Sequence, residues 1–222
     1  MPIRFAYHPG NVAHSSAPEV DETMRAACRS LDIELIDMPG ATSCGAGILG
    51  QANRRLQITL NARTMSIAED LGMDIITPCA TTAATLFEDL MMLKADSSLM
   101  GEVNRTLEKT TGRVLEGSIK IRHLLQVIME DIGIEKFSKK VKNPIPSPLA
   151  PYYGPNLQQI GLIGGDDVFD PWYMESVIEA GGGDPIRYAS RTTSAGTPGI
   201  FSEEQTVLRQ TANILSDAKT MG

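Results

Sequence analysis

Two cysteines of this sequence, Cys44 and Cys79, stand where side chains can do chemistry. Each follows a predicted strand, at 33–37 or 73–77, and each comes directly before a predicted helix. The carboxyl ends of parallel strands meet at one edge of a sheet, so we expect the two thiols to lie close together. A helix N-terminus favours thiolate over thiol, and a thiolate is a nucleophile or a metal ligand. On position alone, two unrelated loop cysteines remain an equally good interpretation.

A glycine-rich stretch, GAGILG at 45–50, follows the second predicted strand. This spacing is typical of loops that bind dinucleotide phosphates, and Glu69 or Asp70 lies at the distance expected for a ribose contact. However, seven residues separate Asp37 from Gly45, whereas a dinucleotide loop turns tightly off its strand. We therefore prefer close packing of small residues, and keep a nucleotide-binding α/β enzyme as the alternative.

The elements that must position these residues alternate along the first part of the chain. Apolar runs of five residues predict strands at 3–7, 33–37 and 73–77. Apolar residues at helical spacing predict helices over 18–31, 48–71 and 80–94, and Cys28 falls on the apolar side of the first. Residues 97–135 read as mostly helical, without an obvious long strand. This alternation predicts the α/β class, with mainly parallel sheets flanked by helices.

A stretch rich in proline and lysine, KKVKNPIPSPLAP at 139–151, interrupts the pattern. We expect a first domain over 1–140, a linker over 141–150 and a second domain over 151–222. The second domain is predicted to contain strands at 149–153 and 184–189 and helices at 171–181 and from 201 onward. A turn is expected at Gly154 and Pro155, and a capping box between Ser202 and Gln205.

The second domain repeats the first in its sequence. Gly10-Asn11 matches Gly154-Pro155, and the stretch 42–45 matches 193–196. Leu71-Gly72 matches Met221-Gly222, so the second half would stop just before the counterpart of Cys79.

Composition narrows the classes of function. The 222 residues carry 20 basic and 27 acidic side chains, a net charge of −7, which argues against nucleic-acid binding. Three cysteines are too few for a disulfide scaffold and suggest a reducing compartment. We find neither a signal-peptide core at the N-terminus nor an apolar run long enough for a membrane span, so we expect a cytoplasmic location.

Several stretches together resemble the cysteine-rich CCG domain family, found in the B subunit of heterodisulfide reductase and its relatives. They are FAYHPGN, DIELIDMPGATSCGAG, ARTMSIAEDLGMDIITPCATT, IKIRHLLQVIMEDIGIEK, APYYGP and GGGDPIRYASRTTSAG. The resemblance implies two similar Rossmann-like halves related by a pseudo-twofold axis. It also implies that five cysteine thiolates in each half hold a noncubane four-iron–four-sulfur cluster, which cleaves or forms disulfides.

Most of the implied cluster ligands are replaced in this sequence. In the first half the ligand positions fall on Asn11, Ser43, Cys44, Cys79 and Thr82. In the second half Pro155, Ser194 and Ala195 stand at cysteine positions. The resemblance therefore assigns catalysis to Cys44 and Cys79, and metal binding to the same pair only if a cluster of reduced ligation is held.

Histidines could add nitrogen ligands, although a solvated histidine is the commoner case for His8 and His14, which flank the first loop. We expect His123 to be a structural histidine on a helix, and Tyr152 and Tyr153 to belong to the core.

The resemblance implies a subunit of a heterodisulfide-reductase-like electron-transfer complex that acts on sulfur or disulfide substrates. Expected partners are a ferredoxin-like iron–sulfur subunit, a flavin subunit and an active sister B subunit. An iron–sulfur cluster is conceivable in the first half only. An enzymatic role for Cys44 and Cys79 and a structural role as a cysteine-depleted paralogue both remain open. The final helix carries Leu208, Ile214 and Leu215 near one stripe. We therefore expect a hetero-oligomeric interface formed largely by the second half and the loops that carry Cys44 and Cys79.

Overall fold

The structure is a computed structural model that describes residues 2–13, 16–161 and 166–222. It divides into two compact units, Met1–Leu124 and Leu125–Gly222. The predicted linker, residues 141–150, lies within the second unit.

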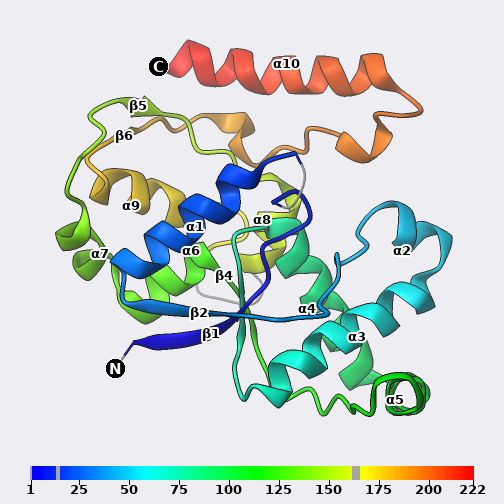
Figure 1. The fold of residues 1–222 in the computed structure, drawn as a ribbon. Coiled ribbons are helices and arrows are strands. Elements are labelled where there is room, and N and C mark those ends of the chain that lie inside the picture. The colour runs from blue at the N-terminus through cyan, green and yellow to red at the C-terminus, as the bar shows by residue number, and fades with distance from the viewer. Residues whose placement is uncertain (1, 14–15, 162–165) are drawn as a thin grey trace. The chain divides into compact units, whose positions relative to one another are not determined.

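A parallel sheet is the centre of the first unit (Figure 1), and it has four strands. Its strands are β1 (Ile3–Tyr7), β2 (Ile33–Asp37), β3 (Ile75–Thr77) and β4 (Ile121–His123). They lie in the order β2-β1-β3-β4, and every neighbouring pair is parallel. All four carboxyl ends therefore meet at one edge, and the predicted α/β class with a parallel sheet is confirmed.

Helices surround this sheet. They are α1 (Pro18–Ser30), α2 (Ile48–Ala52), α3 (Arg54–Asp70), α4 (Ala80–Ala95) and α5 (Ser97–Thr111). Helix α1 packs on β2, α4 packs on β4, and α3 packs on α4 and α5. Cys28 of α1 is fully buried, and burial raises the pKa of its thiol to about 11, so its prediction as a core residue is confirmed.

The structure differs from the sequence expectations for this unit at two places. The single helix expected over 48–71 breaks at Asn53, because the Asn53 side chain accepts a hydrogen bond from the Leu56 N–H and so begins α3. A strand forms within 97–135, because Ile121 is buried in register against Ile75 of β3. That strand has only three residues, so its apolar signal is short.

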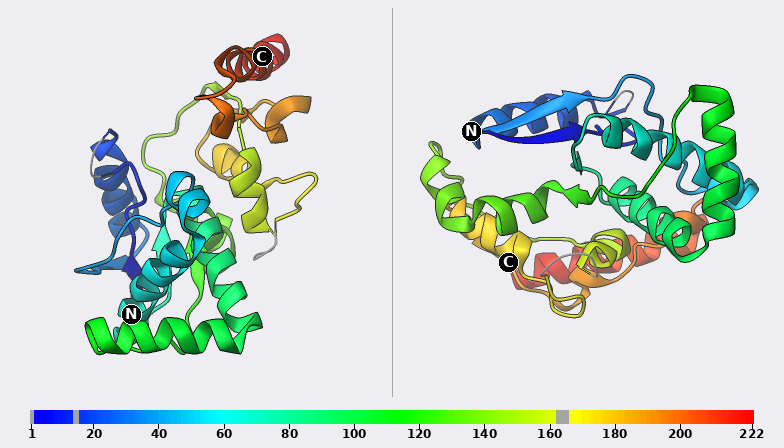
Figure 2. Two further views of the ribbon diagram at one scale, coloured as in Figure 1. Left: turned by 90° about the vertical axis from the view of Figure 1, so that its right-hand side faces the viewer. Right: turned by 90° about the horizontal axis from the view of Figure 1, so that it is seen from below.

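The second unit is mainly helical (Figure 2). It also contains a small parallel sheet of two strands. Helix α6 (Leu124–Gln126) continues as a π-helix (Val127–Ile132) and is followed by α7 (Ile134–Lys140), α8 (Gly154–Gly161), α9 (Tyr173–Ala180) and α10 (Glu204–Met221). Short 3-10 turns cover Ala189–Thr192 and Thr197–Gly199. Strands β5 (Pro148–Leu149) and β6 (Asp184–Pro185) pair in parallel.

The strands expected at 149–153 and 184–189 are thus much shorter than predicted. Pro148, Pro151 and Pro185 have no N–H to give to a ladder, which stops the pairing after two residues. Gly154 and Pro155 begin α8 instead of forming an isolated turn. The expected capping box is absent, because α10 begins after Glu203, whose side chain makes no capping hydrogen bond.

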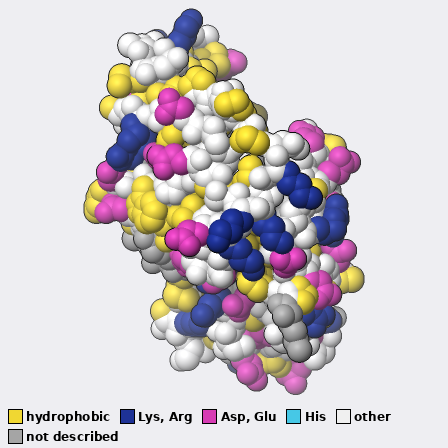
Figure 3. All heavy atoms as spheres, turned by 90° about the vertical axis from the view of Figure 1, so that its left-hand side faces the viewer, with side chains coloured by type: hydrophobic (Ala, Val, Ile, Leu, Met, Phe, Trp, Pro, Cys, Tyr) yellow, Lys and Arg dark blue, Asp and Glu magenta, His cyan; other side chains and the backbone are white. Residues whose placement is uncertain are grey.

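Within the described ranges, no helix is both long enough and apolar enough to cross a membrane. Acidic and basic side chains are interspersed on the face shown in Figure 3. That the chain does not bind nucleic acid stays a prediction.

Candidate functional site

The loop after β1 lies directly against Cys79. Gly10 has a φ of 93°, and a Cβ placed on it would be 2.6 Å from Cys79 Cβ. Any side chain here would both strain the backbone and collide with the cysteine. Glycine is therefore required for this loop to approach the start of α4.

The next residue, Asn11, holds the loop that carries Cys44. Its Nδ2 donates to Cys44 Sγ at 3.2 Å, and its Oδ1 accepts from the Cys44 N–H at 3.3 Å and from Ser43 Oγ at 2.9 Å. One amide side chain thus contacts the thiol and the backbone of the same cysteine. The first and second loops of the sheet edge are tied together through Asn11.

Helix α4 supplies the remaining positions. Cys79 is its N-cap residue, and Thr82 lies three residues later in its first turn. Thr82 Oγ1 is 3.7 Å from Cys44 Sγ, within hydrogen-bonding distance for sulfur. The five residues at the implied ligand positions are therefore gathered at one edge of the sheet.

The two thiols differ in exposure. Cys44 is fully buried and Cys79 is partly exposed, and both are free cysteines. They contact the adjacent residues Asn11 and Gly10. That the two act together in catalysis stays a prediction.

Beneath Cys44 lies a buried polar network that the sequence did not reveal. The Cys44 carbonyl accepts hydrogen bonds from Gln57 Nε2 at 3.1 Å and from Asn61 Nδ2 at 3.0 Å. Asn61 also bonds Asp89, and Arg54 contacts both Asp89 at 2.7 Å and Gln57 at 2.6 Å. Burial raises the Asp89 pKa, while Asn61 and Arg54 oppose that shift. This closed ring fixes the Cys44 peptide.

His8 is buried, so the expectation of a solvated loop histidine was wrong. Its Nδ1 accepts from the Gly10 N–H at 3.1 Å, which leaves Nε2 protonated and donating to the Thr42 carbonyl at 2.9 Å. Both ring nitrogens are engaged in joining two loops, so neither is available to a metal. His14, the other candidate, lies outside the described residues.

His123 ends strand β4, whereas a helix was expected. Its Nε2 bonds the carbonyl of Pro78 at 3.1 Å, directly before Cys79. Burial lowers the His123 pKa to about 4, so the ring is neutral near pH 7. The expected structural role fits this contact, because the ring holds the loop that carries Cys79.

The glycines of the GAGILG stretch allow close packing against neighbouring side chains. A Cβ on Gly45 would lie 2.8 Å from Leu49, and one on Gly50 would lie 2.6 Å from Gln57 Oε1. Helix α2, which this stretch opens, has only five residues. These contacts favour close packing against α3 over a phosphate-binding loop.

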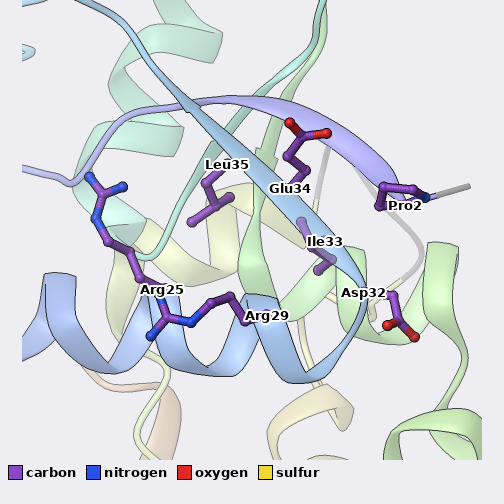
Figure 4. A pocket seen from close by; sticks show the side chains of 7 residues that line it. All are labelled: Pro2, Arg25, Arg29, Asp32, Ile33, Glu34 and Leu35. Atoms are coloured by element: carbon purple, nitrogen blue, oxygen red, sulfur yellow. The ribbon is translucent and has the colours of Figure 1, made fainter.

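The cavities that open on the first unit include two near β2. One, of about 340 Å³, lies between the loops after β1 and β2 and is bordered by Gly10 and Ser43. Its Arg25 is paired with Asp37 at 2.7 Å and with Asp21 at 3.0 Å. The other, of about 400 Å³, lies between α1 and β2 and contains no cysteine (Figure 4). Of these two, the first borders the cysteine loops.

A four-iron cluster does not fit the first-unit site as the side chains stand. The implied ligand set retains two thiols, and Asn11 and Thr82 contact Cys44 Sγ, the atom that would face the iron. Across residues 2–13, 16–161 and 166–222, no group of three or more His, Cys, Asp or Glu side chains is arranged to hold a metal ion.

In the second unit a tyrosine occupies the corresponding loops. Tyr152 is 37% exposed, not a core residue as expected, and its hydroxyl donates to the Thr193 carbonyl at 2.9 Å. The same hydroxyl accepts from the Ala195 N–H at 3.1 Å. Tyr153, in contrast, is buried as expected, and its hydroxyl donates to Glu175 at 2.5 Å.

Comparisons with known proteins agree with this geometry. Residues 5–86 match the family described as "Cysteine-rich domain". The chain is 23% identical over 197 residues to the B subunit of the "Ferredoxin/F(420)H(2)-dependent CoB-CoM heterodisulfide reductase" of Methanosarcina acetivorans, covering 86% of this chain and 64% of that protein. It is 25% identical over 224 residues to the "8-methylmenaquinol:fumarate reductase membrane anchor subunit" of Wolinella succinogenes, covering 98% of this chain and 76% of that one.

A solved structure shares the fold. A hypothetical protein from Helicobacter pylori superposes with a TM-score of 0.69 at 14% sequence identity, covering 96% of this chain and 38% of that protein. The chain thus resembles heterodisulfide reductase B subunits over most of its own length, although it spans only 64% of the Methanosarcina protein.

Proposed function

From the premise that residues 5–86 form a domain of the cysteine-rich family, we propose that this chain is a subunit of a heterodisulfide-reductase-like electron-transfer complex. Its substrates are sulfur or disulfide compounds, and its first-unit site is a modified one in which side chains take the place of a cluster. The observation that carries the proposal is the pair of contacts from Asn11 and Thr82 to Cys44 Sγ.

The chemistry of the side chains at the implied ligand positions supports a site without a cluster. Iron–sulfur clusters are held mainly by thiolates, and an amide or a threonine hydroxyl is a poor substitute for soft iron sites. The Asn11 side chain is hydrogen-bonded to Cys44 and Ser43. The site therefore contains two thiols within a network of hydrogen bonds.

Partner subunits follow from the same proposal. The relatives are named as subunits, and we propose an iron–sulfur subunit, a flavin subunit and an active sister B subunit as partners of this chain. Exposed apolar side chains of the second unit support a protein interface. Val207 and Ile214 of α10 are buried within the unit, whereas Leu208 and Leu215 are 51% and 65% exposed.

Iron analysis of the natively purified complex tests the modified site. We expect the isolated chain to carry less than one iron per chain, and we expect mass spectrometry of the complex to detect an iron–sulfur protein and a flavoprotein. About four irons with equivalent acid-labile sulfide in the isolated chain would contradict the proposal.

A matched variant tests the same proposal by a gain of iron binding. The triple change Asn11→Cys, Ser43→Cys and Thr82→Cys returns five cysteines to the implied ligand positions. After anaerobic reconstitution we expect the triple variant to take up about four irons per chain, and the wild type to take up none stably. Equal uptake by both proteins would show that the three replacements do not determine iron binding.

A further inference from the structure

We propose that Cys44 and Cys79 form a dithiol that closes reversibly to a disulfide and so exchanges two electrons with a disulfide substrate. This inference rests on the proposed function, since it requires that the first-unit site hold side chains and no iron. It assigns a chemistry to the two thiols that remain after the other implied ligands are replaced.

The first argument is that both cysteines contact the same short segments. Gly10 lies against Cys79 Cβ, and the adjacent Asn11 lies 3.2 Å from Cys44 Sγ. Cys44 Sγ is also 3.7 Å from Thr82 Oγ1, in the helical turn that Cys79 caps. A disulfide needs Cα atoms within about 7 Å, and we expect the pair to meet this requirement.

The second argument is the difference in exposure. Cys79 is partly exposed and caps α4, a helix of 16 residues whose N-terminus carries partial positive charge. Cys44 is fully buried and is approached by two donors, Asn11 Nδ2 and Thr82 Oγ1. Cys79, the accessible thiol, is therefore the attacking thiol, and the buried Cys44 is the resolving thiol.

The exchange balances without a cofactor. The Cys79 thiolate attacks one sulfur of the substrate disulfide, so that a mixed disulfide forms, the substrate S–S bond breaks and one substrate thiolate leaves. The Cys44 thiolate then attacks Cys79 Sγ, which forms the Cys44–Cys79 bond and releases the second substrate thiolate. Two protein thiols are oxidised, one disulfide is reduced, and the two protons pass to the leaving thiols. A thiol reductant reverses the sequence.

A thiol count in glutathione redox mixtures tests the proposal on the full chain, with iron measured on the same sample. After equilibration and alkylation, we expect the wild type to lose two alkylatable thiols together as oxidised glutathione rises. Peptide mapping should find 44 linked to 79. The matched control, Cys28→Ser, removes the buried core thiol and should show the same two-thiol transition.

Single variants separate the two roles. We expect Cys44→Ser to stop at a glutathione adduct on Cys79, and Cys79→Ser to leave Cys44 reduced at least about tenfold longer because it is buried. A stable glutathione adduct on Cys79 in the wild type, or three alkylatable thiols at every ratio, would overturn the dithiol. Since the wild type and Cys28→Ser retain both thiols, this readout does not depend on the folding of the single variants.

The two proposals fail in different ways. About four irons per chain would overturn the modified site and the dithiol with it. An iron-free chain that never links 44 to 79 would overturn the dithiol alone.

Discussion

The loops at the sheet edge of the first unit and the matching loops of the second unit differ in what stands at the positions that the family resemblance assigns to cysteines. In the first, Asn11 and Thr82 turn toward a retained thiol and contact Cys44 Sγ. In the second no cysteine is present, and the Tyr152 hydroxyl bridges two backbone groups, the Thr193 carbonyl and the Ala195 N–H. A thiol is therefore present in one region, whereas in the other a tyrosine hydroxyl joins two backbone groups of different loops.

The two matched glycines give the sharpest test of this comparison. Gly10→Ala is expected to lower the free energy of unfolding by about 3 kcal/mol, because its φ is 93° and its Cβ would overlap Cys79 Cβ. Gly154→Ala should cost about 1 kcal/mol, because its Cβ would meet only the partly exposed Tyr152 ring at 3.3 Å. Denaturant unfolding of both variants measures the difference. Equal losses would mean that the two loops are under the same packing constraint.

Acid should weaken the first region between pH 6.5 and 4 through His123, which is neutral in the folded chain. The His123 pKa falls from 6.5 to about 4 on folding, so the unfolded chain binds more protons between these values. This contribution is fully present above pH 6.5 and is lost as the pH falls toward 4, by about 2 kcal/mol for this partly exposed ring. His123→Gln should flatten that part of the stability curve, measured by denaturant unfolding at each pH. If the free energy of unfolding of His123→Gln changes with pH as steeply as that of the wild type, His123 is not the cause of the acid effect.

The smallest expected effect belongs to the second region. Tyr152→Phe removes the bridging hydroxyl and should cost about 0.5–1 kcal/mol, since the hydroxyl is partly exposed and water can replace one partner. Thermal unfolding compares it with Tyr153→Phe, whose hydroxyl is buried on Glu175 and should matter more. A larger loss of stability in Tyr152→Phe than in Tyr153→Phe would show that the exposed hydroxyl bridge stabilises the second unit more than the buried hydroxyl does.

The sequence predicts most strands and helices of the first unit, because each of its first three strands is followed by a helix with clear apolar spacing. It missed β4, since three residues give little periodicity and only pairing with buried Ile75 reveals the strand. In the second unit the proline positions were visible, but their effect on strand length was underestimated. The α/β class therefore followed from local patterns, whereas strand lengths depended on tertiary pairing.

The position of the candidate site at the sheet edge was predicted from Cys44, Cys79 and the spacing of the residues around them. The ring formed by Arg54, Gln57, Asn61 and Asp89 was missed, because polar residues on a predicted helix are normally assigned to its solvent face. A usable signal was present in Asn61, whose neighbours Leu60 and Ala62 are apolar. The burial of His8 could not be predicted from the sequence. Its donor, the Gly10 N–H, and its acceptor, the Thr42 carbonyl, lie on different loops that only the fold brings together.

The two histidine rings also bear on how the sheet edge moves. His8 connects the end of β1 to the loop after β2, and His123 connects the end of β4 to the loop after β3. Opening any one of these loops requires the loss of a hydrogen bond to a second strand end. Their amide hydrogens should therefore exchange with solvent through a shared, slow opening and not through independent fraying, so the cysteine loops behave as one cooperative unit on the timescale of hydrogen exchange.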